Sequence, residues 1–173
     1  VSSGEGNTQA LFIHWAPKNK MQLLASEAWK TAALPAAQTR MQWMFCLPVQ
    51  IDGRHGMDLF AGGKNKGAQL GWFEAPEHPR QLAAWRWHAL RAAGWIMSLA
   101  AADMDGDADL DLVFSDRKGK QSGCYWLENP GRSTDQTRPW KEHAIGATGR
   151  EVMFLTLADL DRDGLQDVVA AVK

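Results

Sequence analysis

Most of the aspartates gather in two short windows of the chain and share one spacing. In each window they occupy positions 1, 3, 5 and 9 of a loop, and the second window lies 56 residues after the first. Carboxylates packed this closely repel one another unless a cation lies among them, and hard oxygen donors at alternating positions of a tight loop suit Ca²⁺. With the backbone carbonyl at position 7 as a further donor, the spacing predicts two calcium ions per chain. The predicted ligands are Asp103, Asp105, Asp107, Asp111 and the Asp109 carbonyl in the first loop, and Asp159, Asp161, Asp163, Asp167 and the Leu165 carbonyl in the second.

Two other interpretations of these loops are an EF-hand and a solvated turn. An EF-hand needs an acidic ligand at position 12 and a helix on each side. Position 12 is Phe114 in the first loop and Ala170 in the second, and the flanking apolar runs are short, as in strands. A single Asp-rich turn needs no ion. Two turns with one ligand spacing favour metal binding over both alternatives.

A third, weaker copy of the loop departs from this pattern. It has Gln50, Asp52, Arg54 and Asp58 at positions 1, 3, 5 and 9. An arginine in place of a ligand predicts that its guanidinium lies near the vacant cation position and pairs with Asp52 and Asp58. We therefore expect no ion at the third loop.

The loops belong to an internal repeat with a period of 53–59 residues. The motif Trp72-Phe73-Glu74-Ala75-Pro76 aligns with Trp126-Leu127-Glu128-Asn129-Pro130, and Trp85 aligns with Trp140. Short apolar runs and glycine-bearing hairpins fill each unit, so the segment 81–93, which has some helical character, is predicted as a strand. This period suits a four-stranded propeller blade. The sequence therefore predicts an all-β propeller with about three blades per chain.

The phase of the repeat divides the chain into four parts. We expect a half-blade over 1–40 with a hairpin from Ser3 to Asn7, complete blades over 41–93 and 94–149, and a half-blade over 150–173. The two half-blades are complementary, yet three blades are fewer than a closed ring has. The chain is therefore expected to complete a ring as a homo-oligomer, or to be a part of a longer propeller.

The aspartate loops, together with the apolar strands Asp111-Leu112-Val113 and Asp167-Val168-Val169, resemble the FG-GAP/VCBS repeats of calcium-binding β-propellers. This architecture is that of the integrin alpha-chain head and of many bacterial surface proteins. The resemblance covers essentially the whole chain and implies an extracellular, periplasmic or cell-surface location. Only the ligand positions given above carry over from it.

Comparison of the repeat units separates scaffold residues from candidate binding residues. Tryptophans that recur in the units are expected to pack in the core. Three others are replaced by glutamate in a sister unit, which predicts aromatic faces near solvent that bind a sugar or a protein, with partial burial as the open alternative. The recurring tryptophans are Trp72 and Trp126, and Trp29, Trp85 and Trp140; the candidate binding residues are Trp15, Trp87 and Trp95.

Composition restricts the functions that remain. The chain has 173 residues, 45% of them hydrophobic, and a net charge of −1. We expect no nucleic-acid partner and no membrane insertion. The basic hairpins around 62–67 and 117–123 are predicted to be solvated. No nucleophile, phosphate-loop or zinc motif is present. We therefore expect a non-enzymatic, calcium-stabilised binding scaffold for carbohydrate or protein, the alternative being a propeller portion of a polysaccharide-degrading enzyme.

Overall fold

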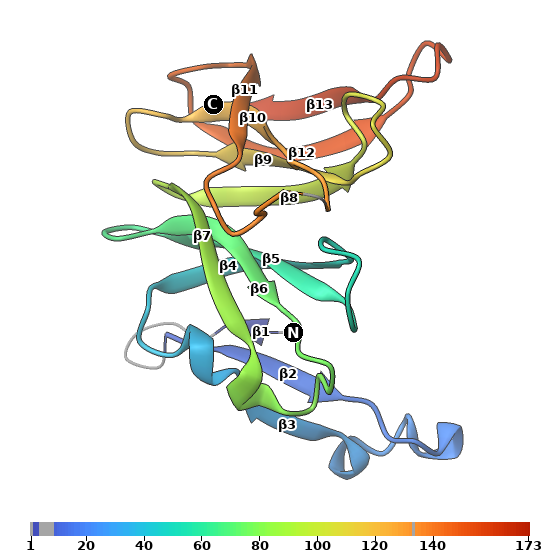
Figure 1. Cartoon of the computed structure of the whole chain (residues 1–173). Coiled ribbons are helices and arrows are strands. Elements are labelled where there is room, and N and C mark those ends of the chain that lie inside the picture. The colour runs from blue at the N-terminus through green and yellow to red at the C-terminus, as the bar shows by residue number, and fades with distance from the viewer. Residues whose placement is uncertain (1, 4–8, 133) are drawn as a thin grey trace.

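The computed structural model describes residues 2–3, 9–132 and 134–173, and the protein is all-β with four antiparallel sheets. The sheets follow the chain and lie one above another, from β1–β3 to β12–β13 (Figure 1). We number them sheet 1 to sheet 4 in this order. The hairpin expected from Ser3 to Asn7 lies largely outside the described residues.

Sheets 2 and 3 have four strands each, and every strand pairs with the next one along the chain. These sheets confirm the four-stranded units that the repeat predicts. The segment 81–93 contains one 3-10 turn and a strand, as predicted. Sheet 2 contains β4 (Gln42–Val49), β5 (Asp58–Lys64), β6 (Gln69–Glu74) and β7 (Arg86–Ala92), and sheet 3 contains β8 (Ile96–Ala102), β9 (Asp111–Asp116), β10 (Gly123–Glu128) and β11 (Lys141–Gly146).

The two outer sheets are smaller. Short 3-10 helices (Lys20–Gln22, Ser26–Ala28, Pro35–Ala37 and Leu82–Ala84) are the helical elements of the described residues, and none of them has the length to cross a membrane. Sheet 1 contains β1 (Ser2–Ser3), β2 (Leu11–Trp15) and β3 (Lys30–Ala33), and sheet 4 contains β12 (Val152–Ala158) and β13 (Asp167–Val172).

Two apolar cores hold the sheets together, one between sheets 1 and 2 and the other between sheets 2 and 3. In the second core, the rings of Phe60 from sheet 2 and Trp140 from sheet 3 meet edge to face at 5.7 Å. The first strands of sheets 2, 3 and 4 also lie in contact with one another: β4 contacts β8, and β8 contacts β12. Sheets 2 and 3 therefore each bury one face against the preceding sheet and the other against the following one.

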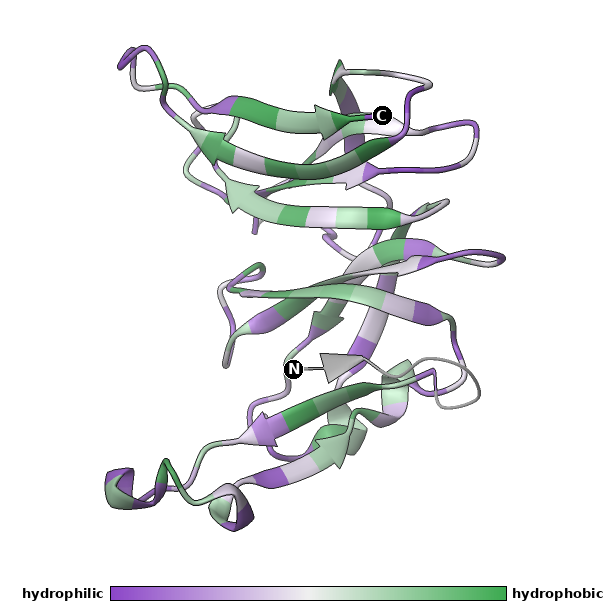
Figure 2. Ribbon diagram, turned by 180° about the vertical axis from the view of Figure 1, so that it is seen from behind, coloured by the Kyte–Doolittle hydropathy of each residue, from purple (hydrophilic) through white to green (hydrophobic). Residues whose placement is uncertain are grey.

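The outer faces of the stack are more exposed than the equivalent faces inside it. Val169 of sheet 4 is 47% exposed, whereas its repeat equivalent Val113 of sheet 3 is fully buried under sheet 4. Figure 2 shows how apolar the strands of this outer sheet are. At the other end, Trp29 is 37% exposed while Trp85 and Trp140 are buried. The core position predicted for Trp29 is wrong here, because Trp85 and Trp140 pack on the preceding sheet and no described sheet precedes sheet 1.

Candidate metal-binding loops

Three loops of one shape connect the first and second strands of sheets 2, 3 and 4. In each loop the residues at positions 4 and 6 have positive φ, although only one of the two is glycine. Such a conformation costs energy for residues with a side chain, so the loop shape must be fixed by other contacts. The residues with positive φ are Gly106 and Ala108 in the sheet 3 loop, Arg162 and Gly164 in the sheet 4 loop, and Gly53 and His55 in the sheet 2 loop.

The side chain at position 1 supplies these contacts. The Asp103 carboxylate accepts hydrogen bonds from the backbone N–H groups of Gly106 (2.7 Å) and Ala108 (3.0 Å). Asp159 accepts one from Gly164 at 3.1 Å, which is the equivalent of the Ala108 bond. The loops of sheets 3 and 4 are therefore each wound around their first carboxylate.

The structure brings together three of the four side-chain ligands predicted in each loop. Oxygen atoms at positions 1, 3 and 9 lie within 4.8 Å of one another in both loops. The carboxylates at position 5, Asp107 and Asp163, lie outside these groups and accept the N–H of the residue two positions on, at 2.9 and 2.8 Å. Oxygen donors gathered at this distance suit a hard cation. The groups are Asp103, Asp105 and Asp111 in sheet 3, and Asp159, Asp161 and Asp167 in sheet 4.

The carboxylate at position 9 differs most between the two loops. Asp111 is buried and accepts the N–H groups of Met104 and Asn129, both at 2.8 Å. Burial above all, with the negative charges of neighbouring carboxylates as a smaller cause, raises the pKa of Asp111 from 3.8 to about 6. Asp167 is exposed, and Leu160 donates the equivalent of the Met104 bond at 2.9 Å. The sheet 3 loop is therefore anchored in the core, and a cation there would relieve buried negative charge.

In the loop of sheet 2, an amide nitrogen takes the place that we predicted for a guanidinium. Gln50 Nε2 donates to the carbonyls of Arg54 at 2.9 Å and Gly56 at 2.7 Å, which are positions 5 and 7 of the loop. Both oxygens of the buried Asp58 are held by backbone N–H groups, those of Ile51 and Ala75. The predicted pairing of Arg54 with Asp58 is therefore wrong, because Asp58 is buried and both of its oxygens already accept backbone hydrogen bonds.

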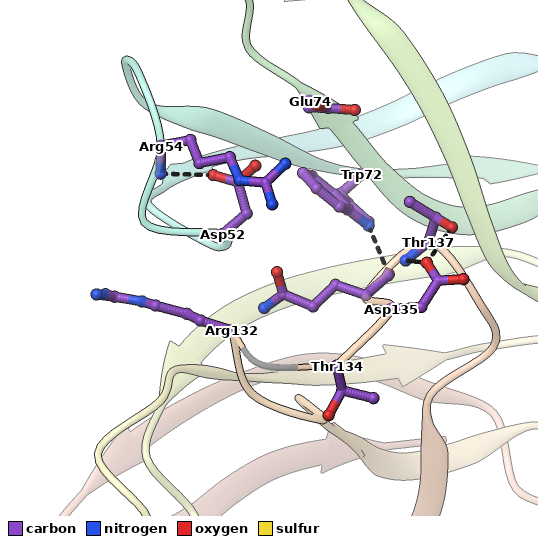
Figure 3. A pocket seen from close by; sticks show the side chains of 9 residues that line it. Asp52, Arg54, Trp72, Glu74, Arg132, Thr134, Asp135 and Thr137 are labelled. Carbon is purple, nitrogen blue, oxygen red and sulfur yellow. Dashed lines mark hydrogen bonds between the residues drawn. The ribbon is translucent and has the colours of Figure 1, made fainter.

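Arg54 lines a pocket of about 120 Å³ instead. Its side chain extends from the loop toward Trp72, and the opposite wall comes from the connection between β10 and β11 (Figure 3). Asp52, Glu74 and Asp135 also line this pocket. The sequence did not predict it, because its walls come from segments more than fifty residues apart with no shared motif.

The three candidate binding tryptophans are all half-buried. Trp15 lies under the guanidinium of Arg80, 4.6 Å from the ring centroid. Trp87 packs edge to face on Trp43 at 5.1 Å, beside the first core. Trp95 lies at the junction between sheets 2 and 3. These three side chains are therefore partly buried, which is the alternative that the sequence left open. Their role in ligand binding stays a prediction.

Two loops gather carboxylates, and a third loop of the same shape satisfies its carbonyls with an amide. No family model, no curated protein and no solved structure matches this chain.

Proposed function

We propose that the chain is a calcium-stabilised β-propeller module that serves as a non-enzymatic binding scaffold. The observation that carries this proposal is the contrast between the three loops. Two of them share a backbone shape and three convergent carboxylates, and the third has the same shape but an internal amide donor. The carbonyl oxygens of such a loop need a binding partner, and either a calcium ion or an amide N–H can supply it.

Calcium in this proposal is structural. The loops of sheets 3 and 4 each join the first two strands of a sheet, so a bound ion fixes the position of one strand relative to the other. It also neutralises carboxylates that otherwise repel one another. Such sites suit an environment rich in calcium, which is why we place the protein outside the cell, in the periplasm or at the cell surface.

Titration calorimetry with Ca²⁺ tests the number of sites. We expect two ions per wild-type chain. Asp105→Asn should remove one of them, because it takes a charge from position 3 of the sheet 3 loop. Asp52→Asn is the matched control, since Asp52 holds position 3 in the loop of sheet 2, and it should leave both ions bound. Three equivalent sites, or none, would contradict the proposal.

The exposure of the apolar outer faces of the stack supports our proposal that the sheets belong to a closed propeller ring. Inside the stack, each such face is covered by a neighbouring sheet, so we propose that a sheet of the same kind covers the outer faces as well. A second copy of the chain, or further blades of a longer chain, would supply it. In the first case the exposed face of β12 and β13, with Phe154 and Val169, would be covered by the next copy.

The mass in solution tests self-assembly of this chain. We expect light scattering to give the mass of an assembly, with the dimer as the first expectation from closed symmetry. Val169→Asp should shift the mass to that of one chain, because it buries an unpaired charge in the contact. Thr134→Asp is the control for an added surface charge, because Thr134 is exposed in the connection between β10 and β11 that faces sheet 2. A wild-type mass of 19.2 kDa would reject assembly.

Carbohydrate and protein are the two ligand classes that the half-buried tryptophans support. Carbohydrate is favoured slightly, because indole rings stack on sugars. The enzymatic alternative is a propeller portion of a polysaccharide-degrading protein, and it would require acid and base residues that converge on one face outside the loops.

A further inference from the structure

Basic groups from two hairpins gather on one indole at the end of the sheets opposite to the aspartate loops (Figure 1). Trp95 precedes β8, and its backbone forms a bridge with Lys64 and accepts the N–H of Arg117 at 2.8 Å. Lys64 and Arg117 lie over its ring at 5.2 and 5.3 Å, and Lys118 lies over it at 4.7 Å. The hairpins of sheets 2 and 3, far apart in the sequence, therefore share one aromatic surface.

The equivalent junction between sheets 3 and 4 is built in the same way but pairs its cation with a carboxylate. Glu151 holds the position of Trp95, and Lys173 donates its N–H to the Glu151 carbonyl at 2.9 Å, as Arg117 does to Trp95. The Glu151 carboxylate lies 3.1 Å from Arg117 Nε. An indole attracts cations through its ring but does not cancel their charge. At the junction of Trp95, Lys118 therefore lies over an uncharged ring instead of beside a carboxylate, whereas Arg117 is paired with Glu151.

A pocket of about 370 Å³ opens at this junction, which is a volume typical of ligand sites. Small residues, Ala92, Ala93, Gly94 and Gly119, line it, with Gly94 packed closely on the backbone of Lys118, and the exposed Lys118 and Lys120 also line it. The carboxylate in the lining, Asp116, is buried and accepts the N–H groups of Gly94 (3.0 Å) and Trp95 (2.8 Å).

We propose that this pocket, beside the junction of Trp95, binds an acidic polysaccharide, with a sugar ring over the small residues and its sulfate or carboxylate group on Lys118 and Lys120. Charge-assisted hydrogen bonds to lysine suit both acidic groups. A nucleic acid is the less suitable polyanion, because it is held by many phosphate contacts along a basic face and this chain has a net charge of −1. The inference specifies the ligand class of the proposed binding scaffold and rests on that role.

The test measures binding of the wild-type chain to immobilised dextran sulfate, polygalacturonate, neutral dextran and an oligothymidylate of matched length. We expect binding to one or both acidic polysaccharides and weakening by added salt. The double variant Lys118→Ala/Lys120→Ala should bind at least tenfold more weakly. Lys18→Ala/Lys20→Ala, which removes two exposed lysines from the connection between β2 and β3, is the matched control and should bind as the wild type does.

Trp95→Glu supplies a second variant, because it copies the sister junction. Trp95 Nε1 is buried and has no hydrogen-bond partner among the described residues, so the exchange removes no hydrogen bond of the indole. We expect it to abolish binding of the acidic polysaccharide by neutralising the lysines, while the calcium titration stays unchanged. Equal binding to neutral dextran, stronger binding to the oligothymidylate, or wild-type binding by the lysine double variant would overturn the inference. Because the calcium sites are measured separately, its failure is distinguishable from failure of the proposed function.

Discussion

Calcium raises the thermal unfolding temperature of the wild-type chain, and EDTA lowers it again: this is the first of the two largest effects that we expect. An ion that binds only the folded state stabilises it by about 2.7 kcal/mol at a hundredfold excess over Kd. For a domain of this size the corresponding shift is about 5–10 °C for each occupied site. Differential scanning calorimetry in calcium and in EDTA measures it, and coincident curves would contradict a structural ion.

Variants of the loops show how much each calcium site contributes to this rise in unfolding temperature. Asp105→Asn should lose about half of the calcium response, and Asp161→Asn the other half, because each removes the position 3 carboxylate of one loop. Asp52→Asn in the sheet 2 loop should keep the full response. Position 3 is the better test position, because Asp111 also holds the N–H of Asn129 and its replacement would destabilise the chain without any ion.

The response should also depend on pH. Burial raises the pKa of Asp111 in the ion-free protein to about 6, above the ordinary value of 3.8. Without calcium, this carboxyl binds a proton more readily in the folded than in the unfolded chain, so its contribution to stability falls as pH rises through 6. Calcium requires the ionised form and competes with the proton. The calcium-induced shift should therefore shrink as pH falls from 7 to 5.

The strands and the carboxylate loops could be predicted because their signals are local. Short apolar runs fix β8 and β9, and the alternating aspartates fix which side chains meet, since a nine-residue turn leaves few other ways to place them. Asp107 lies outside the group of convergent carboxylates and accepts the N–H of Asp109, yet Asp105 within the group accepts the N–H of Asp107 in the same way. Spacing alone does not distinguish a ligand from such a turn contact.

The contacts between sheets could not be predicted in the same way. That Gln50 satisfies the carbonyls of its loop depends on the length of its side chain in a fixed backbone, and the sequence suggested Arg54 for this position. The gathering of basic groups on Trp95 depends on how two hairpins approach each other. A repeat predicts that units stack, but not which side chains meet where they do.

The second large effect concerns Arg91, a buried side chain that no motif marks. It extends from β7 of sheet 2 into sheet 3, where its guanidinium donates to Glu142 Oε2 at 2.6 Å and lies 3.6 Å from Asp116. The same group lies over the rings of Phe114 and Tyr125, at 4.9 and 5.3 Å. One side chain thus supplies charge, hydrogen bonds and apolar packing to the contact between the two complete sheets.

Removal of one partner from a buried ion pair leaves the other charges uncompensated, which costs about 3–5 kcal/mol. We therefore expect Arg91→Ala to lower the free energy of unfolding by this amount in urea denaturation, with or without calcium. Arg91→Lys keeps the charge but not the planar fork, so it should lose less. Arg138→Ala is the matched control, because Arg138 pairs with Asp135 through a side chain that is 79% exposed, and it should cause no measurable change. If Arg91→Ala were as harmless as Arg138→Ala, sheets 2 and 3 would be held by their apolar core alone, and the ion pairs of Arg91 would add nothing to the contact.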